Sequence, residues 1–344
     1  MVIYKIVKKS NMKKIIFSII LSHFALVQIA SAQSHAKLIN TFHIESAGGW
    51  DYLIPNPQTN KLYVSHGTQV NILDKKTGDS LGIITNTTGV HGITFINALG
   101  KGYTSNGRLN NVSVFDLKTN QVLSQITTGE NPDAIFYEPF TKTIITCNGR
   151  SKDLTIIDPI TEKVIATIPV GGKPETAVSN EAGQIFVNVE DKNEIVQIDI
   201  VNYKVLAHWS IIPGEEPTGL AIDIATKRLF AGTGGKLVVV DAIKGTVVKV
   251  IPIGEGCDGV AYDNATKLIY TSNGTGTMTI IRAKSANEYE VIENVTTKKG
   301  ARTIGIDEST HTVYLPTANF EPQAADDKSR PKMIAGSFQI LVIK

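Results

Sequence analysis

The sequence predicts an all-β fold, a seven-bladed β-propeller whose blades are four-stranded antiparallel sheets. One observation is a group of four short apolar segments, 219–222, 228–231, 237–240 and 247–253, separated by clusters of Gly, Asp, Thr and Lys. Segments of this length and spacing are typical of consecutive antiparallel strands. A single four-stranded sheet cannot bury both of its faces, so this unit requires neighbours of the same kind.

A second observation is that the unit repeats along the chain. The residues equivalent to Phe230 recur every 40–44 residues, at Tyr63, Tyr103, Ile145, Phe186, Phe230, Tyr270 and Tyr314. The Asp that closes the third strand recurs at Asp74, Asp116, Asp158, Asp199 and Asp241. A period of about 40–45 residues with four strands per unit indicates a propeller. The seven blades are expected to start near residues 50, 90, 132, 174, 217, 257 and 301.

In chain order, the first predicted element is an export signal in residues 1–32. An uncharged apolar run, 15–30, follows Lys13 and Lys14 and leads into Ala30-Ser31-Ala32, a signal-peptidase pattern. Residues 12–32 make a complete signal alone, so Met12 is an alternative start. Removing residues 1–32 takes away five Lys and no acidic residue, so the formal net charge falls from +2 to −3. We expect a periplasmic or secreted protein that does not span the membrane after cleavage and whose body is not basic enough to favour nucleic acid.

Residues 33–344 are expected to form the propeller as one domain. The last unit, from 301, has three recognisable strands and ends at 338–343, whereas 38–44 has strand character and precedes the first unit. We expect 38–44 to supply the missing outer strand, which closes the ring and removes exposed sheet edges. An inserted loop, 319–336, interrupts the last blade and is expected to be a flap over the channel, a docking arm or a disordered segment. Cys147 and Cys257 fall three blades apart, too far for a disulfide, so both are expected to be free thiols.

The amino-acid sequences of the repeats resemble those of a known family. Thr-Lys-Leu-Ile-Tyr-Thr-Ser-Asn-Gly (266–274), Thr-Asn-Lys-Leu-Tyr-Val-Ser-His-Gly (59–67) and Gly-Lys-Gly-Tyr-Thr-Ser-Asn-Gly (100–107) are similar to the YVTN-type repeat of the YncE-like secreted propellers. The resemblance runs from about residue 38 to residue 344. It implies an exported propeller that serves as a ligand- or partner-binding scaffold, with single-stranded-DNA binding attributed to one branch.

Candidate site residues lie where each blade leads into its innermost strand. These mouth positions are Asp51, His91, Asp133, Glu175, Thr218, Asp258 and Arg302. One interpretation is turn chemistry, because Asp beside Pro or Gly commonly bonds its own backbone in turns. The other is an acidic ring at the channel mouth that binds a cationic or sugar-like ligand. Alternatively, Asp51, Asp133, Glu175 and Asp258 could hold Ca²⁺ or another divalent cation through carboxylate oxygens.

A second candidate set lies in the loops between the second and third strands, which open on the same face. Its members are His66, Asn106, Asn148, Val189, Thr233, Asn273 and Thr317. Asn-Gly is first a hairpin-turn signal, because both residues tolerate positive φ. Amide oxygens beside carboxylates also suit a calcium site, as in the propeller-type calcium-dependent lactonases that this mixture resembles.

Two further features bear on nucleic acid. Arg108, Arg150 and Lys152 form a local basic patch in two adjacent loops of the mouth face. Trp50 could stack on a base or a sugar, or could cap the channel. The nearby acidic mouth positions oppose a polyanion, so nucleic acid is an alternative rather than the leading hypothesis.

No catalytic motif is present: the His residues are scattered, and there is no nucleophile elbow, phosphate loop or CxxCH haem site. The leading hypothesis is therefore a monomeric exported binding scaffold without a cofactor, which binds a small ligand or a protein at the channel mouth. The first alternative is a metal-dependent, lactonase-like hydrolase with His91 as its base. The second is a single-stranded nucleic-acid binder.

Overall fold

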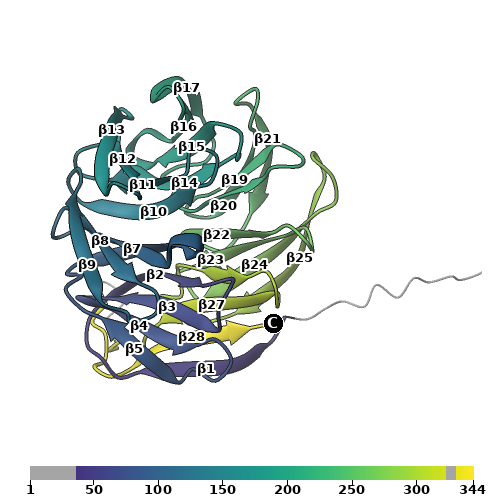
Figure 1. Ribbon diagram of the computed structural model, residues 1–344. Coiled ribbons are helices and arrows are strands. Elements are labelled where there is room, and N and C mark those ends of the chain that lie inside the picture. Colours follow the sequence, from purple (N-terminus) through teal and green to yellow (C-terminus); the bar gives the residue numbers. More distant parts are fainter. Residues whose placement is uncertain (1–35, 323–330) are drawn as a thin grey trace, which may run out of the picture. The chain divides into compact units, whose positions relative to one another are not determined.

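The computed structural model describes residues 36–322 and 331–344. The chain divides into residues 1–35, which include the predicted export signal and lie outside the described residues, and a compact unit, residues 36–344. This unit consists of seven four-stranded antiparallel sheets (Figure 1). The innermost strands of neighbouring sheets contact one another in the cyclic order β2, β6, β10, β14, β18, β22, β26 and back to β2. The predicted all-β, seven-bladed propeller is confirmed.

The strands of each blade follow one another in the chain, except in the last blade. Blade 1 contains β2 (Trp50–Pro55), β3 (Lys61–His66), β4 (Gln69–Asp74) and β5 (Ser80–Ile84). Blade 2 contains β6 (Val90–Ile96), β7 (Lys101–Asn106), β8 (Asn111–Asp116) and β9 (Val122–Thr127). Blade 3 contains β10 (Pro132–Glu138), β11 (Thr143–Asn148), β12 (Asp153–Asp158) and β13 (Lys163–Pro169). Blade 4 contains β14 (Pro174–Ser179), β15 (Gln184–Val189), β16 (Glu194–Asp199) and β17 (Lys204–Ser210).

The remaining blades complete the ring. Blade 5 contains β18 (Leu220–Asp223), β19 (Arg228–Gly232), β20 (Lys236–Asp241) and β21 (Val247–Pro252). Blade 6 contains β22 (Cys257–Asp263), β23 (Leu268–Asn273), β24 (Thr277–Ala283) and β25 (Tyr289–Thr296). Blade 7 contains β26 (Gly305–Asp307), β27 (Thr312–Thr317), β28 (Phe338–Ile343) and β1 (Leu38–Ile44). Two short 3₁₀ turns, η1 (Asn97–Leu99) and η2 (Glu190–Lys192), lie in loops, and the described part of the chain has no helix long and apolar enough to cross a bilayer.

The ring closes as the sequence predicts, because β1 forms the outer strand of blade 7. It pairs antiparallel with β28, with Phe42 opposite Ile340, and Phe42 is only 3% exposed. The Phe42 ring lies so close to Gly78 that a Cβ there would fall 2.3 Å from the ring, and Gly78 has φ +78°. Gly78 therefore allows the closing strand to pack against blade 1.

The core lies between neighbouring sheets rather than inside the channel. One cluster joins Tyr63 and Ile72 of blade 1 to Ile93 and Phe115 of blade 2. The repeating aromatic or Ile position in the second strand is buried in all seven blades. Each sheet thus covers both faces with its neighbours, which explains why one unit requires the others.

The Asp that ends the third strand caps the turn that follows it. Asp116 Oδ1, for example, accepts hydrogen bonds from the backbone N–H groups of Lys118 (2.9 Å) and Thr119 (2.6 Å). These bonds, with that of the Thr119 hydroxyl, lower the pKa of Asp116. The recurring Asp is turn chemistry on the face opposite the channel mouth.

Cys147 and Cys257 are both buried free thiols, as expected. Burial raises the pKa of the Cys257 thiol to about 12. Burial also raises the pKa of Cys147, with a further contribution from Asp133 and Glu175. Neither thiol is poised to act as a nucleophile.

Candidate functional site

The seven mouth positions meet at one cavity of about 320 Å³. Its lining comprises Asp51, Tyr52, His91, Asp133, Lys173, Glu175, Glu190, Thr218, Asp258 and Arg302. Every blade contributes one of the positions singled out by aligning the repeats. The cavity contains five carboxylates against three basic side chains.

A recurring irregularity in the innermost strands presents these side chains. Asp51, His91, Asp133, Glu175 and Asp258 are each the second residue of an innermost strand. Each lies at a shift in the register with the second strand, such as the shift between Trp50 and Leu53 in β2. A bulge of this kind bends the strand locally and re-aims a side chain. Here it directs the second residue toward the cavity.

The Ser of the repeated motif supports this bulge. Ser65 Oγ accepts a hydrogen bond from the Asp51 backbone N–H (3.1 Å) and donates one to the Tyr52 carbonyl (2.9 Å). Ser105 accepts from the Gly92 N–H (2.8 Å) and donates to the carbonyl of Asp133 in the next blade. The motif therefore holds the backbone of the site without lining the cavity.

Ion pairs run along much of the cavity wall. Arg302 pairs with Asp258 and lies 3.4 Å from Asp51 Oδ1. At the opposite end, Lys173 pairs with Glu190 and lies 2.6 Å from Glu175 Oε1. The carboxylates are the more deeply set groups, since the side chains of Asp51 and Glu175 are 14% and 10% exposed, against 40% for Lys173.

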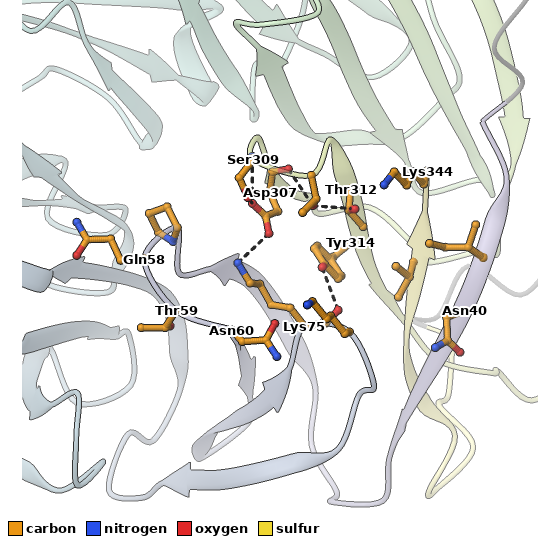
Figure 2. A pocket seen from close by; sticks show the side chains of 15 residues that line it. Asn40, Gln58, Thr59, Asn60, Lys75, Asp307, Ser309, Thr312, Tyr314 and Lys344 are labelled. Atoms are coloured by element: carbon orange, nitrogen blue, oxygen red, sulfur yellow. Dashed lines mark hydrogen bonds and ion pairs between the residues drawn. The ribbon is translucent and has the colours of Figure 1, made fainter.

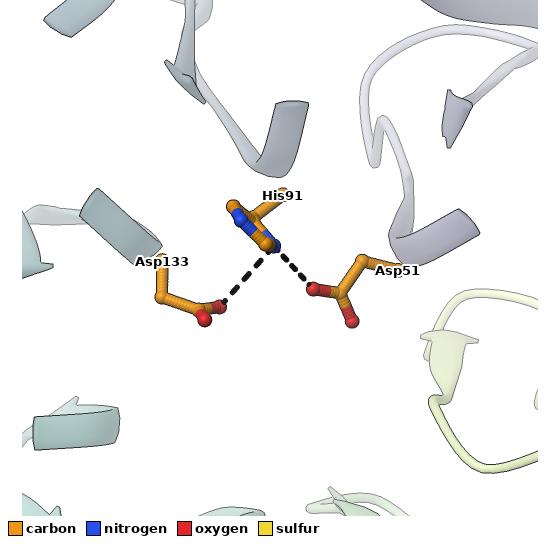
Figure 3. A group of neighbouring side chains, drawn as sticks. All are labelled: Asp51, His91 and Asp133. Carbon is orange, nitrogen blue, oxygen red and sulfur yellow. Dashed lines mark hydrogen bonds and ion pairs between the residues drawn. The ribbon is translucent and has the colours of Figure 1, made fainter. Parts of the chain in front are cut away.

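His91 lies between two of the carboxylates, as Figure 3 shows. Its Nδ1 is 2.6 Å from Asp51 Oδ2 and 3.9 Å from Asp133 Oδ1. Burial lowers the pKa of His91, but the hydrogen bond to Asp51 and the charges of Asp133, Asp51 and Glu175 outweigh burial and raise it to about 9. His91 is therefore a cation at neutral pH, and it does not act there as a free general base.

Asp133 is the carboxylate with the fewest partners. Its only ion-pair neighbour in the described chain is His91 at 3.9 Å, and its side chain accepts no hydrogen bond from the described residues. Burial first, and the nearby charge of Asp51 second, raise the pKa of Asp133 to about 6. Burial and the charge of Asp133 raise the pKa of Glu175 to about 8. Both carboxylates would gain from a cationic or hydrogen-bond-donating ligand.

Tyr52 also lines the cavity. It belongs to blade 1, yet it packs against the buried cluster of blades 3 and 4 that contains Ala134 and Cys147. Burial, followed by the charges of Asp133, Asp51 and Glu175, raises the pKa of Tyr52 well above its ordinary value. Tyr52 is neutral at any physiological pH.

Three of these lining residues are not among the positions predicted from the repeats. Tyr52 follows a mouth position and points to the cavity because of the bulge, which the spacing does not reveal. Lys173 precedes Glu175 by two residues, and Glu190 stands where most blades have the Gly of the motif. Glu190 could have been predicted as a site residue, because a charged residue replaces Gly at this position of the repeat.

The second candidate set does not line this cavity. His66, Asn106, Asn148 and Asn273 are fully buried and bonded within the fold. His66 contacts Ser46 Oγ (2.8 Å) and the Gly48 carbonyl (2.9 Å). Their assignment as ligand-binding residues is not supported by this placement.

The three Asn residues share one arrangement. The Asn148 amide donates to Asp153 (2.7 Å) and Thr155 (2.8 Å) and accepts from Thr146 (2.9 Å). Asn106 and Asn273 make the equivalent bonds in their own blades. Each Asn-Gly lies at a hairpin turn, as predicted, but none of the three Asn residues has a positive φ, so the expected reason for the pair at these turns is wrong. This buried arrangement could have been predicted from two features of the sequence: a Thr two residues before each Asn, and a polar residue at the start of the next strand.

Trp50 lies beside the channel rather than facing into it. Its ring stacks on Phe338 at 5.2 Å and contacts Phe320 at 6.1 Å, and it is not part of the cavity lining. Arg108, Arg150 and Lys152 are exposed, and Lys152 pairs with Asp191 at 2.8 Å. The structure thus offers no exposed Trp50 platform beside these basic residues.

The four carboxylates proposed from the sequence as metal ligands, Asp51, Asp133, Glu175 and Asp258, do not form one close group in the described structure. Glu175 is paired with Lys173, and Asp258 is paired with Arg302. Instead, one ligand atom each from Asp51, His91 and Asp133 lie within 4.8 Å of one another. These three side chains could hold a small divalent ion only after His91 has lost its proton, and His91 would then be a ligand.

The inserted loop is described only at its base, because 323–330 lie outside the described residues. Phe320 and Met333 form an isolated antiparallel bridge, and the Glu321 N–H donates to the Lys332 carbonyl (2.8 Å). Phe320 also contacts the Trp50 ring. The base of the insert therefore covers Trp50.

Comparison with known proteins supports the fold alone. No family model matches the chain, and no curated protein matches it. Among solved structures, the chain is similar to Kuenenia stuttgartiensis hydrazine synthase, with 16% identity over 79% of this chain and 94% of that chain, and a TM-score of 0.71. It is also similar to the RRP9 WD40 repeats (9% identity, 89% and 97% covered, TM-score 0.75) and to U3-55K (10%, 88% and 97%, TM-score 0.73).

Proposed function

We propose that this protein is an exported propeller that binds a small cationic ligand in the cavity at the channel mouth. The observation that carries the proposal is the surplus of carboxylates there, five against three basic groups, together with Asp133, whose side chain accepts no hydrogen bond from the described residues. A protonated amine would give Asp133 the partner it lacks and would relieve its repulsion with Asp51. A volume of about 320 Å³ suits a molecule of amino-sugar or diamine size.

Export and family membership are part of the same proposal. The Lys-rich start, the apolar run 15–30 and Ala30-Ser31-Ala32 support secretion to the periplasm or beyond. The resemblance of segments such as 266–274 to YVTN repeats supports a place among exported binding scaffolds. N-terminal sequencing of the protein recovered from the periplasm tests this part, and a chain that keeps residues 1–32 would contradict it.

The binding proposal is tested by calorimetry with 1,4-diaminobutane and glucosamine, using 1,4-butanediol and glucose as neutral counterparts. We expect only the amines to bind, with an affinity that falls as salt is added. Asp133→Asn should weaken binding roughly tenfold or more, as expected for loss of a charge-assisted hydrogen bond. Glu288→Gln is the matched control, because Glu288 is 68% exposed on a turn of blade 6. Equal binding of the neutral compounds, or an unaffected Asp133→Asn protein, would refute the proposal.

The second candidate is a divalent-ion-dependent hydrolase, favoured by the grouping of Asp51, His91 and Asp133. An ion held there could polarise the carbonyl of a lactone. The protonated His91 and the paired Arg302 and Lys173 oppose it at neutral pH. The metal content of the protein decides between the two candidates.

A further inference from the structure

A second cavity, of about 730 Å³, lies at the seam between blade 7 and blade 1 (Figure 2). Its walls are the turn 57–60, the turn at Lys75 and Lys76, the turn that follows Asp307, and the outer strands β1 and β28. These turns belong to the face opposite the channel mouth. The seam cavity is thus separate from the site described above.

The seam differs from the equivalent junction between blades 4 and 5. There the matching turns enclose only about 290 Å³, and Phe186, Ile222, Ile224 and Ile243 contribute apolar surface to it. At the seam most of the lining residues carry a hydroxyl, amide or ammonium group, while Ile39, Val342 and Tyr314 add apolar surface. The two cavities share the matching turns, but only the seam is also lined by residues of outer strands, Ile39, Asn40 and Val342, and only the seam contains a buried Lys.

The most unusual of these side chains is Lys75. The residue after the Asp that closes the third strand is apolar in blades 2 to 5, namely Leu117, Pro159, Ile200 and Ala242. In blade 1 it is Lys75, whose side chain is only 9% exposed. Its Nζ donates to Asp307 Oδ2 (2.8 Å) and to the Asn56 carbonyl (3.1 Å). An ammonium has three hydrogens, and the third finds no acceptor among the described residues.

A buried ion pair of this kind is weak evidence for stability, because desolvation offsets the attraction between its charges. An apolar residue serves the same position in four other blades. The Lys75 ammonium is therefore better explained by what it can bind. Asp307 neutralises the charge of Lys75, while the third ammonium hydrogen of Lys75 is still available to a ligand.

Further donors surround the same space. Lys76 and Lys344 are exposed in the lining and have no carboxylate partner among the described residues. Asn40, labelled on β1 in Figure 2, uses its amide oxygen to accept the Thr41 N–H (2.8 Å), and its NH₂ group has no acceptor among the described residues. Asp307 is the only acidic side chain in the lining, and it is paired. The cavity therefore has a net positive charge and a surplus of donors.

We propose that the seam cavity binds a small hydroxylated anion of the sugar-acid or sugar-phosphate class. The anionic group would accept the third Lys75 hydrogen and pair with Lys76 or Lys344, while its hydroxyls would bond the hydroxyl and amide rim around Thr59 and Ser309. The volume falls within the range of small-molecule sites. Two free lysines are too few to fix a long polyanion, whose binding depends on many phosphate contacts.

Ligand-observed NMR and calorimetry on the purified protein test this with glucuronate, glucose 6-phosphate and neutral glucose. We expect one or both anions to bind and glucose not to bind, and whichever anion binds identifies the acidic group. Lys76→Gln, on an exposed turn, should weaken binding roughly tenfold without changing the melting temperature. Lys118→Gln is the matched control, because Lys118 holds the same turn position in blade 2.

Two more variants complete the test. The pair Lys75→Met with Asp307→Asn removes the buried donor without leaving a buried charge unpaired, and it should abolish binding in a protein that still unfolds cooperatively. Asp133→Asn, at the mouth, should leave anion binding unchanged, which separates this site from the cationic site. The absence of binding by either anion, or binding that survives both Lys76→Gln and the Lys75/Asp307 pair, would overturn the proposal.

Discussion

The imidazole of His91 and the carboxylate of Asp51 lie 2.6 Å apart, Nδ1 to Oδ2, although the two residues belong to neighbouring blades. Burial lowers the pKa of His91, but Asp51, Asp133 and Glu175 outweigh it and raise the pKa from an ordinary 6.5 to about 9. The folded protein thus retains a proton that the unfolded chain would release. The pair contributes its full stability below about pH 6.5 and loses it as the pH rises through about 9.

His91→Gln should therefore be less stable than the wild type at pH 6, by about 2 kcal/mol, and equally stable near pH 10. Urea denaturation at several pH values measures the difference. His208→Gln is the control, because His208 is an exposed partner of Glu194 on an outer strand. A difference between His91→Gln and the wild type that does not change with pH would contradict the assigned ion pair.

Glu175 should make the folded protein less stable at alkaline pH. Burial and the charge of Asp133 raise its pKa from 4.5 to about 8, so its contribution is lost as the pH rises from about 4.5 through 8. Glu175→Gln cannot ionise and should escape this loss. Relative to the wild type, we expect the variant to gain about 1–3 kcal/mol of unfolding free energy between pH 5 and pH 9. Glu288→Gln should show no such gain, and an equal response of both variants would contradict the shift.

Removal of divalent ions should leave the melting temperature unchanged. The carboxylates that a calcium site would need are paired with Arg302 and Lys173, and His91 carries a proton at neutral pH. Elemental analysis and thermal melts with and without a chelator measure this. A stoichiometric ion whose removal lowers the melting temperature, and which is absent from Asp133→Asn, would instead favour the hydrolase.

Much of the fold could be predicted because the repeat encodes it. Alignment on Phe230 predicted seven blades and the place of 38–44, since a residue at a fixed offset in a repeated sheet occupies a fixed place in the ring. The same logic brought Asp51, His91 and Asp133 to one cavity. The repeat gives the position of a residue along its strand. Because the blades are arranged in a ring, residues at the same position in the innermost strands of different blades lie close together at the centre.

Side-chain direction in the loops could not be obtained in this way. Asn148 and Asp133 both lie at strand ends on the mouth face, yet Asn148 bonds within its own blade while a bulge directs Asp133 to the cavity. Trp50 packs against Phe320, which lies 270 residues later in the chain. No local sequence pattern predicts a contact between residues so far apart. Ion pairing between blades, as between Arg302 and Asp51, depends equally on long-range geometry.

Asn148 should be a structural residue. Its amide makes three hydrogen bonds in a fully buried place, so Asn148→Ala leaves buried polar groups without partners. We expect a loss of about 2–3 kcal/mol in unfolding free energy. The exposed Asn287→Ala should cost much less. Binding of amines at the mouth should persist in the folded Asn148→Ala protein, and a selective loss of binding without loss of stability would restore its role as a ligand residue.

Closure of the ring through β1 should carry a large share of the stability of the propeller. Phe42 is 3% exposed and packs with Ile44, Leu73 and Phe338, so it joins the two ends of the chain to blade 1. Phe42→Ala should lower the unfolding free energy by about 3–5 kcal/mol, because it removes a buried ring and leaves a cavity. Leu38→Ala, at a position 55% exposed on the same strand, should change it by less than about 1 kcal/mol. Urea denaturation distinguishes the two, and a Phe42→Ala protein as stable as Leu38→Ala would show that the seam does not depend on β1.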